Sequence, residues 1–362
     1  MILRDLKKFK RIIVTGGAGF IGSALIKRLL NESEAKIFNL DKLSYSSNLK
    51  RLNLNSSKVK ADKYQFIKID LENELLLKQA ISKIDPDIVF HLAAESHVDR
   101  SIDNPKIFFS SNVLGTFNLV NILRNHWEKL NPKRKERFLF HHISTDEVFG
   151  SCENQEKFNE KSKYDPSSPY AASKACSDHL VNSFFKTYGF PTLITNCSNN
   201  YGPWQFPEKF IPLAIIKALN KKAIPLYGNG CNIRDWLFIE DHIDALLLAS
   251  QKSLPGEKYC IGGYGETKNI DLLKVLCEIL DEKLDNGFNH YSLVELVKDR
   301  PGHDQRYSIN STKFSSEIGW QAKTKLYEGI KYTVNWYIEN EKWWREIDEK
   351  SIYKGERLGM LS

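Results

Sequence analysis

The fold is decided by the stretch Arg11-Ile12-Ile13-Val14-Thr15-Gly16-Gly17-Ala18-Gly19-Phe20-Ile21-Gly22. Its first five residues favour a strand, its glycines a tight turn, and the apolar spacing through Leu30 a helix. Glycines let the backbone approach a pyrophosphate, and the amino terminus of the helix supplies N–H donors. The glycines fit both G-x-G-x-x-G from Gly17 and G-x-x-G-x-x-G from Gly16, and glycine turns also serve close packing. The stretch therefore predicts the first unit of a dinucleotide-binding domain.

Further strands are expected at 36–40, 64–69, 87–91, in a run entered at Phe138, and at 192–196, with helical segments between them. Strands that alternate with helices are joined by right-handed crossovers into a parallel sheet. The fold class is therefore α/β, with a Rossmann-like, doubly wound parallel sheet.

Acidic residues close two of these strands. Asp41 is placed to accept hydrogen bonds from a ribose 2′-hydroxyl and to repel a 2′-phosphate, which favours NAD over NADP. Asp70 suits a contact with the adenine edge, or a helix cap for the residues from Glu72 onward. The small residues that follow the fourth strand let the backbone pass close to a cofactor.

A hydroxyl and two adjacent carboxylates end the run His141-His142-Ile143-Ser144-Thr145-Asp146-Glu147-Val148-Phe149-Gly150. At the carboxyl end of a parallel strand they would face the crevice where open α/β sheets bind ligands. A solvated acidic loop is the alternative. Downstream, Tyr170 and Lys174 are four residues apart and share one face of a helix expected to reach about Tyr188, so the lysine can stabilise a phenolate.

Composition sets limits on partners and compartment. The 362 residues are 41% hydrophobic and 27% charged, with a net charge of +7. The mild basic excess suits an anionic ligand such as a nucleotide, while nucleic acid is not expected as a partner. The six cysteines show no metal spacing, so no metal site is expected. With no membrane-length apolar run and no signal peptide visible, a cytoplasmic protein without a membrane partner is expected.

Together, the glycine turn, Asp41, Thr145, Tyr170 and Lys174 resemble the extended short-chain dehydrogenase/reductases. Five motifs are similar to those of the dTDP-glucose 4,6-dehydratases within that group: 93–102, 145–148, 198–203, 234–236 and 299–304. Phe149 stands where those proteins usually have tyrosine, the segment 150–169 looks shorter than in many relatives, and the first ten residues are an extension.

The resemblance implies a reaction in which NAD oxidises C4 of a nucleotide-linked glucose, water leaves across C5 and C6, and hydride returns to C6. Tyr170 would be the base at C4, held as phenolate by Lys174 and assisted by Thr145. Glu147 would remove the C5 proton, and Asp146 would protonate the leaving C6 hydroxyl.

The resemblance also implies ligand contacts and a domain division. The expected NAD-binding residues are Gly16, Gly19, Phe20, Ile21, Gly22, Asp41, Lys42, Leu43, Ser44, Asp70, Leu71, Leu92, Ala93, Ala94, Ser96, Ser111, Tyr170, Lys174 and Asn200. The expected nucleotide-sugar contacts are Ser96, Thr145, Asn199, Glu208, Lys209, Pro225, Tyr227, Arg234, Asn269, Arg300 and His303. Residues 1–197, with returning segments near 230–262, would form the NAD-binding domain, and 198–362 mainly the substrate lobe and a closing helix from Leu326.

Several alternatives stay open. The arginines at 234 and 300 could be solvated or structural. A 4-epimerase, a decarboxylase or a dehydratase of UDP-, CDP- or GDP-sugars is the nearest rival, although an epimerase needs no elimination acid. An idle NAD-binding protein is a distant one. A homodimer is expected through long helices starting near Asn104 and Tyr170, whose apolar stripes permit it.

Overall fold

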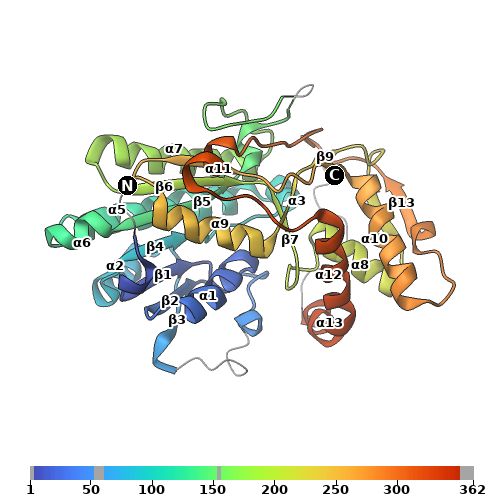
Figure 1. Cartoon of the computed structure of the whole chain (residues 1–362), viewed down its shortest axis with the longest axis horizontal. Coiled ribbons are helices and arrows are strands. Elements are labelled where there is room, and N and C mark those ends of the chain that lie inside the picture. Colours follow the sequence, from blue (N-terminus) through green and yellow to red (C-terminus); the bar gives the residue numbers. More distant parts are fainter. Residues whose placement is uncertain (1–3, 53–60, 153–155, 351–362) are drawn as a thin grey trace.

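A parallel sheet of seven strands forms the centre of the computed structural model, which describes residues 4–52, 61–152 and 156–350 (Figure 1). The order across the sheet is β11-β6-β5-β4-β1-β2-β3. The strands are β1 (Arg11–Thr15), β2 (Lys36–Asp41), β3 (Tyr64–Lys68), β4 (Ile88–His91), β5 (Leu139–Thr145), β6 (Thr192–Cys197) and β11 (Lys258–Ile261). All six strands expected from the sequence are present, and the doubly wound parallel sheet is confirmed.

The strand order reverses at β1. Thr15, its last residue, lies opposite Leu40 of β2 on one side and His91 of β4 on the other. Successive connections therefore run in opposite directions from this point, and the loops after β1 and β4 separate. Ligands of open α/β sheets bind at such a switch point, outside the carboxyl ends of the strands.

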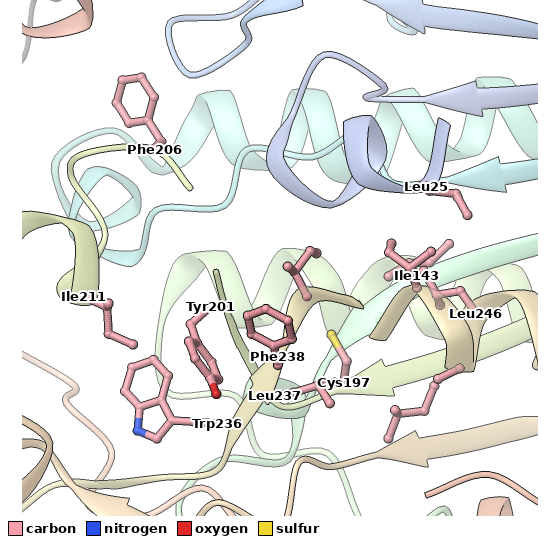
Figure 2. Packing of buried hydrophobic residues seen from close by; sticks show 14 of the residues in the cluster. Leu25, Ile143, Cys197, Tyr201, Phe206, Ile211, Trp236, Leu237, Phe238 and Leu246 are labelled. Carbon is pink, nitrogen blue, oxygen red and sulfur yellow. The ribbon is translucent and has the colours of Figure 1, made fainter. Parts of the chain in front are cut away.

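Helices cover both faces of the sheet, so its strands are nearly continuous apolar runs. Alternate residues of β1 point to opposite sides: Ile12 packs with α1 (Phe20–Glu32) and α9 (Ile239–Lys252), whereas Ile13 packs with helices on the other face. Those helices are α2 (Glu74–Ile84), α5 (Gly115–Trp127) and α7 (Pro169–Tyr188). Figure 2 shows Leu25 of α1 and Leu246 of α9 gathered around Ile143 of β5.

The smaller lobe lies on the right of Figure 1. Short strands pair within it and at its edge: β7 (Asn199–Tyr201) with β10 (Trp236–Phe238), β8 (Ile224–Tyr227) with β13 (Val294–Val297), and β9 (Ile233–Arg234) with β12 (Thr267–Lys268). Its helices are α8 (Phe210–Leu219), α10 (Asn269–Leu284), α12 (Leu326–Glu339) and α13 (Glu341–Lys350). The helix expected from Leu326 is thus two helices, separated at Asn340.

The segment that returns from this lobe, α9 and β11, completes the large layer, because β11 pairs with β6. The domain division expected from the sequence, with a boundary at 197 and returning segments near 230–262, stays a prediction. The remaining short elements are η1 (Leu6–Lys8), η2 (Leu49–Leu52), η4 (Ala61–Lys63), α6 (Pro132–Arg137), η6 (Asp146–Phe149), η7 (His290–Leu293) and α11 (Thr312–Ile318). Within the described ranges, no helix has the length and apolar content needed to span a membrane.

The long helix expected from Asn104 is interrupted. It consists of α4 (Pro105–Phe108), the π-helical turn η5 (Phe109–Leu114) and α5, and the short helix α3 (Val98–Asp103) precedes it. The amide of buried Asn112 in η5 bonds the backbone of Glu95 in both directions, at 2.8 and 3.0 Å. This contact ties the loop after β4 to the helix layer. Such π-helical turns often occur at functional sites.

Candidate functional site

One cleft lies at the carboxyl ends of the strands. The glycine turn, the ends of β2, β4 and β5, the first turns of α7 and the segment 197–209 line it. Every residue expected to bind NAD lines this cleft except Leu43. Leu43 has a left-handed backbone (φ 60°) and donates its N–H to the Asp41 carboxylate at 2.7 Å, so it shapes the loop through its backbone.

Close backbone packing explains the glycines of the first turn. Gly16 has φ +69°, and a Cβ there would lie 2.7 Å from the nitrogen of Ala93. Gly16, Gly19 and Gly22 line the cleft. Gly17 instead lies against Asn39, whose Oδ1 would be 2.3 Å from a Cβ added at Gly17. The cleft therefore uses the G-x-x-G-x-x-G spacing. No side chain caps the amino terminus of α1, so its N–H groups suit a pyrophosphate, and the turn fits a dinucleotide.

Asp41 organises the loop beside this turn. Its carboxylate accepts hydrogen bonds from the backbone of Ala18 (2.9 Å) and Leu43 (2.7 Å) and from the hydroxyl of Ser47 (3.0 Å). The sequence predicted a ribose contact for Asp41 but not these hydrogen bonds within the loop. Asp41 also lines the cleft, where a 2′-phosphate would meet its negative charge.

Asp70 lines the same cleft and accepts a hydrogen bond from the N–H of Glu72 at 3.1 Å. The helix α2 begins later, at Glu74, and Asn73 caps it by accepting from Leu76. The alternative interpretation of Asp70 as the helix cap is therefore wrong. Nearby, Lys42 forms an ion pair with Glu95 at 3.1 Å.

A tyrosine and a lysine meet the end of β5. Ser168 caps α7, so Tyr170 and Lys174 lie in its first two turns and both line the cleft. The ammonium of Lys174 donates to the carbonyl oxygen of Ile143 at 2.9 Å. Burial raises the pKa of Tyr170 well above its ordinary value, and the charge of Glu147 acts in the same direction. A hydrogen bond with Thr145 acts in the opposite direction, so the hydroxyl lies beside the phenol.

The two adjacent carboxylates point apart. Glu147 lines the cleft, whereas the Asp146 side chain is buried beside it and is not part of the lining. Asp146 Oδ2 and Glu147 Oε2 are buried, and neither has a hydrogen-bond partner in the described part of the chain. Unpaired buried oxygens are costly, so they suit a site that completes its hydrogen bonds with a ligand.

The surroundings separate the acidities of this pair. Burial raises the pKa of Asp146 well above its ordinary value, and the charges of Glu147 and Asp235 raise it further. Burial also raises the pKa of Glu147, but the cations of Arg300 and Arg234 act against this rise. Two carboxyl groups in such unlike surroundings favour one protonated acid and one ionised base.

The expected nucleotide-sugar contacts fall into two groups. Ser96, Thr145, Asn199, Glu208 and Lys209 line the cleft, whereas Pro225, Tyr227, Arg234, Asn269, Arg300 and His303 do not.

In the group outside the lining, Asp99 accepts hydrogen bonds from Arg300 (2.7 Å) and Tyr227 (2.8 Å). Arg234 lies 4.2 Å from the ring centroid of Tyr307. The charges of Arg300 and Arg234 act on Glu147, so these two arginines lie near the acid pair.

Two lining residues already bridge the cleft walls. The carboxylate of Glu208 accepts from Tyr45 (2.5 Å) and from Arg100 (2.9 Å), and the ammonium of Lys209 donates to the carbonyl oxygen of Ser96 at 2.7 Å. These contacts hold the loops after β2 and β4 against the segment that leads into α8.

Known proteins similar to this chain show its family. The family model described as GDP-mannose 4,6 dehydratase matches residues 13–333. A probable dTDP-glucose 4,6-dehydratase of Sinorhizobium fredii is 49% identical over 97% of this chain and 99% of its own length. The chain belongs to the dTDP-glucose 4,6-dehydratase family.

Solved structures place the dehydratase fold among related enzymes. A dTDP-glucose 4,6-dehydratase from Streptomyces venezuelae, solved with NAD bound, has a TM-score of 0.83 and 37% identity over 93% of this chain and 99% of that one. A UDP-glucose 4-epimerase from Thermotoga maritima has a TM-score of 0.79 and 26% identity over 91% and 99%. Because dehydratases and epimerases share this fold, the site must distinguish them.

Within the dehydratase site, sequence reasoning missed a buried cluster next to Lys174. Asp178, four residues further along α7, bonds His142 of β5 and Asn196 of β6. The spacing of four was a usable signal, because it places Asp178 on the helix face of Lys174. The partners on two strands had no such signal.

Phe149, which stands where the related dehydratases usually have tyrosine, is a buried ring packed on Phe158 and Tyr164.

Proposed function

We propose that the protein converts dTDP-glucose into dTDP-4-keto-6-deoxyglucose and water, with NAD as an internal redox cofactor. The observation that carries this proposal is an acid pair, the buried Asp146 and the cleft-lining Glu147, at the end of β5 where Tyr170 and Lys174 also line the cleft. Bound NAD would supply the redox chemistry, taking hydride from C4 and returning it to C6. The glycine turn would hold the pyrophosphate, and Asp41 the adenosine ribose.

At C4, Tyr170 acts as the base. The phenolate form takes the proton of the C4 hydroxyl, and the cation of Lys174 stabilises that form. Because burial and the charge of Glu147 both oppose ionisation of Tyr170, the ammonium is essential to it. Thr145, beside the phenol, donates a hydrogen bond to the same substrate oxygen.

The acid pair performs the elimination. A ketone at C4 acidifies the proton at C5, and Glu147, ionised near Arg300 and Arg234, removes it. Asp146 keeps its proton because it is buried beside another carboxylate, and it donates that proton to the leaving C6 hydroxyl. When hydride returns to C6, Glu147 gives its proton back to C5, and exchange with solvent restores the proton of Asp146 and the phenolate of Tyr170.

The diphosphate and the base bind beyond the acid pair. Arg234 is the strongest candidate for the diphosphate, because a guanidinium offers paired donors with a permanent charge. The remaining proposed contacts to the sugar nucleotide are Ser96, Asn199, Glu208, Lys209, Pro225, Tyr227, Asn269, Arg300 and His303.

An epimerase is the second candidate, since the fold is common to both activities. Epimerisation needs a transient ketone at C4 but no acid at C6. A carboxyl group held protonated by burial next to a second carboxylate has no role in that chemistry. The pair therefore favours the dehydratase, and the same argument disfavours an idle binding protein.

A panel of nucleotide-glucoses tests the function. Purified protein, without added cofactor, is incubated with dTDP-, UDP-, CDP- and GDP-glucose, and the alkali-induced absorbance of a 4-keto sugar is followed. We expect product from dTDP-glucose and none from a Tyr170→Phe control. Formation of a galactose epimer without the keto sugar, or keto sugar from another nucleotide only, would contradict the assignment.

We also infer a homodimer in the cytoplasm. Four large apolar side chains on the helical run from α4 to α5 are exposed by more than two-fifths: Ile107 (46%), Phe109 (42%), Leu114 (46%) and Phe117 (42%). A second copy would remove this face from water. All six cysteines are free thiols, which suits a reducing compartment.

A further inference from the structure

A buried carboxylate lies one helical turn beyond the catalytic lysine, and the proposed reaction does not use it. Asp178 of α7 is 1% exposed. Its Oδ1 lies 3.1 Å from Nε2 of His142, and its Oδ2 accepts from the hydroxyl of Tyr164 (2.7 Å) and the amide of Asn196 (2.9 Å). We call these four residues the Asp178 cluster.

The carboxylate of this cluster is ionised. Tyr164 and Asn196 both donate hydrogen bonds to this carboxylate. Burial lowers the pKa of His142 to about 4, so its imidazole is neutral and has a single N–H to donate to Asp178. Burial raises the pKa of Asp178, but the hydrogen bond from His142 and the charge of Lys174 outweigh that effect and bring it to about 2. A negative charge is therefore fixed behind the active site.

Lys174 is the cation that this charge faces. The ammonium is buried, and its hydrogen bond goes to the neutral carbonyl of Ile143. Burial lowers the pKa of Lys174, and the strongest opposing influence is the charge of Asp178. The thiol of Cys197 also faces the lysine, but its pKa is raised to about 12 by burial and it stays neutral.

Other titratable groups approach from each neighbouring element. Tyr170 and Glu147 lie on the cleft side, and the neutral imidazole of His91 lies on β4. Lys258 of β11 faces Asp178, and its ammonium lies 4.2 Å from the ring centroid of Tyr164. The charge of Asp178 thus acts on two cations, of which Lys174 is the one that lines the cleft.

We propose that Asp178 is a positioning residue whose fixed negative charge keeps Lys174 protonated and thereby sets the pH range in which the Tyr170–Lys174 pair works. This inference rests on the proposed function of that pair. In the active form the Tyr170–Lys174 pair has lost one of its two protons. Activity therefore falls at low pH, where the pair keeps both protons, and at high pH, where it has lost both. A nearby negative charge makes each of these protons harder to remove, and it moves both limbs of the pH profile to higher pH.

Asp178→Asn tests the proposal. It removes the charge and keeps the shape of the side chain. We expect both limbs of the kcat profile to move to lower pH by about one unit, because a nearby opposite charge shifts a pKa by roughly 1 to 3 units. On the alkaline side kcat then falls about tenfold, a one-unit shift in pKa. The KM for the sugar nucleotide and the NAD content should not change.

Tyr164→Phe is the matched control, because it removes one hydrogen bond and leaves the carboxylate charged. Its limbs should stay at the wild-type positions. Asp178→Ser provides a second neutral side chain in case the amide of the introduced asparagine disturbs the hydrogen bond that Asn196 donates. Unmoved limbs in either neutral variant overturn the proposal, and so does a failure of both to fold, since Asp178 would then be structural. Inactive wild-type protein would instead refute the proposed function.

Discussion

Asp146→Asn removes the proton that the proposed elimination needs and changes little else. Because burial and Glu147 keep Asp146 protonated, an amide of the same shape should fit the same space. Asp146 forms one long hydrogen bond with Thr145, at 3.3 Å, and its Oδ2 has no partner among the described residues. The variant therefore tests the acid itself rather than the packing around it.

The expected loss follows from the protonation state. A general acid contributes about 10² to 10⁴ in rate, or roughly 3 to 5 kcal/mol of barrier. Since burial and the charge of Glu147 favour the protonated form of Asp146, the variant should lose the factor that this acid supplies. We expect keto-sugar formation to slow by at least about a hundredfold.

The partial reactions identify the step that is lost. In Asp146→Asn, oxidation at C4 and solvent deuterium exchange at C5 should continue, so reduced nicotinamide accumulates as absorbance. In Glu147→Gln, the matched variant, exchange at C5 should stop as well. Near-normal turnover in Asp146→Asn, or loss of C5 exchange in it, would refute the assignment of acid and base.

Stability should change in the opposite direction to activity. The folded pKa of Asp146 is raised above its unfolded value of about 3.9, so the folded state binds the extra proton and loses stability as pH rises between the two values. Asparagine has no such loss. Thermal unfolding at neutral pH should therefore show an equal or higher Tm for Asp146→Asn, and a clearly lower Tm would contradict the raised pKa.

Four further outcomes are expected. Gly16→Ala should abolish NAD retention, because its Cβ would lie 2.7 Å from backbone, whereas Gly189→Ala, with a similar φ of +65° and open space, should retain NAD and cost about 1 kcal/mol in chemical unfolding. Asp41→Asn should lower the NAD content of purified protein, and strict NADPH dependence of the wild type would contradict its role. Arg234→Ala should raise KM for the sugar nucleotide at least about tenfold, because one charge-assisted contact to the diphosphate is lost, and NAD binding measured by titration should not change. Phe117→Glu should produce monomers in size-exclusion chromatography, and an unaltered dimer would place the interface elsewhere.

Several features of the fold were readable from local patterns. Five β-prone residues before the turn predicted β1, and the spacing of four predicted that Tyr170 and Lys174 share a face of α7. Such patterns work because the pleat and the helical turn fix which way a side chain points within its own element. The glycines that line the cleft could only be chosen once the structure placed Gly17 against Asn39.

Contacts between distant elements were not readable in this way. The sequence analysis missed Asp178, and no local pattern revealed His142 and Tyr164 as its partners. Nor did a local pattern reveal the π-helical turn that brings Asn112 to the loop after β4. It also placed both acids at the crevice, whereas only Glu147 lines the cleft.

The sequence by itself determined the order of strands and helices, the glycine turn and the chemical groups available at the ends of β5 and α7. Only the tertiary structure decided which carboxyl group keeps its proton, because the pKa depends on burial and on cations that arrive from the smaller lobe. Local spacing fixes the direction of a side chain, while desolvation and charge act through space between residues far apart in the chain.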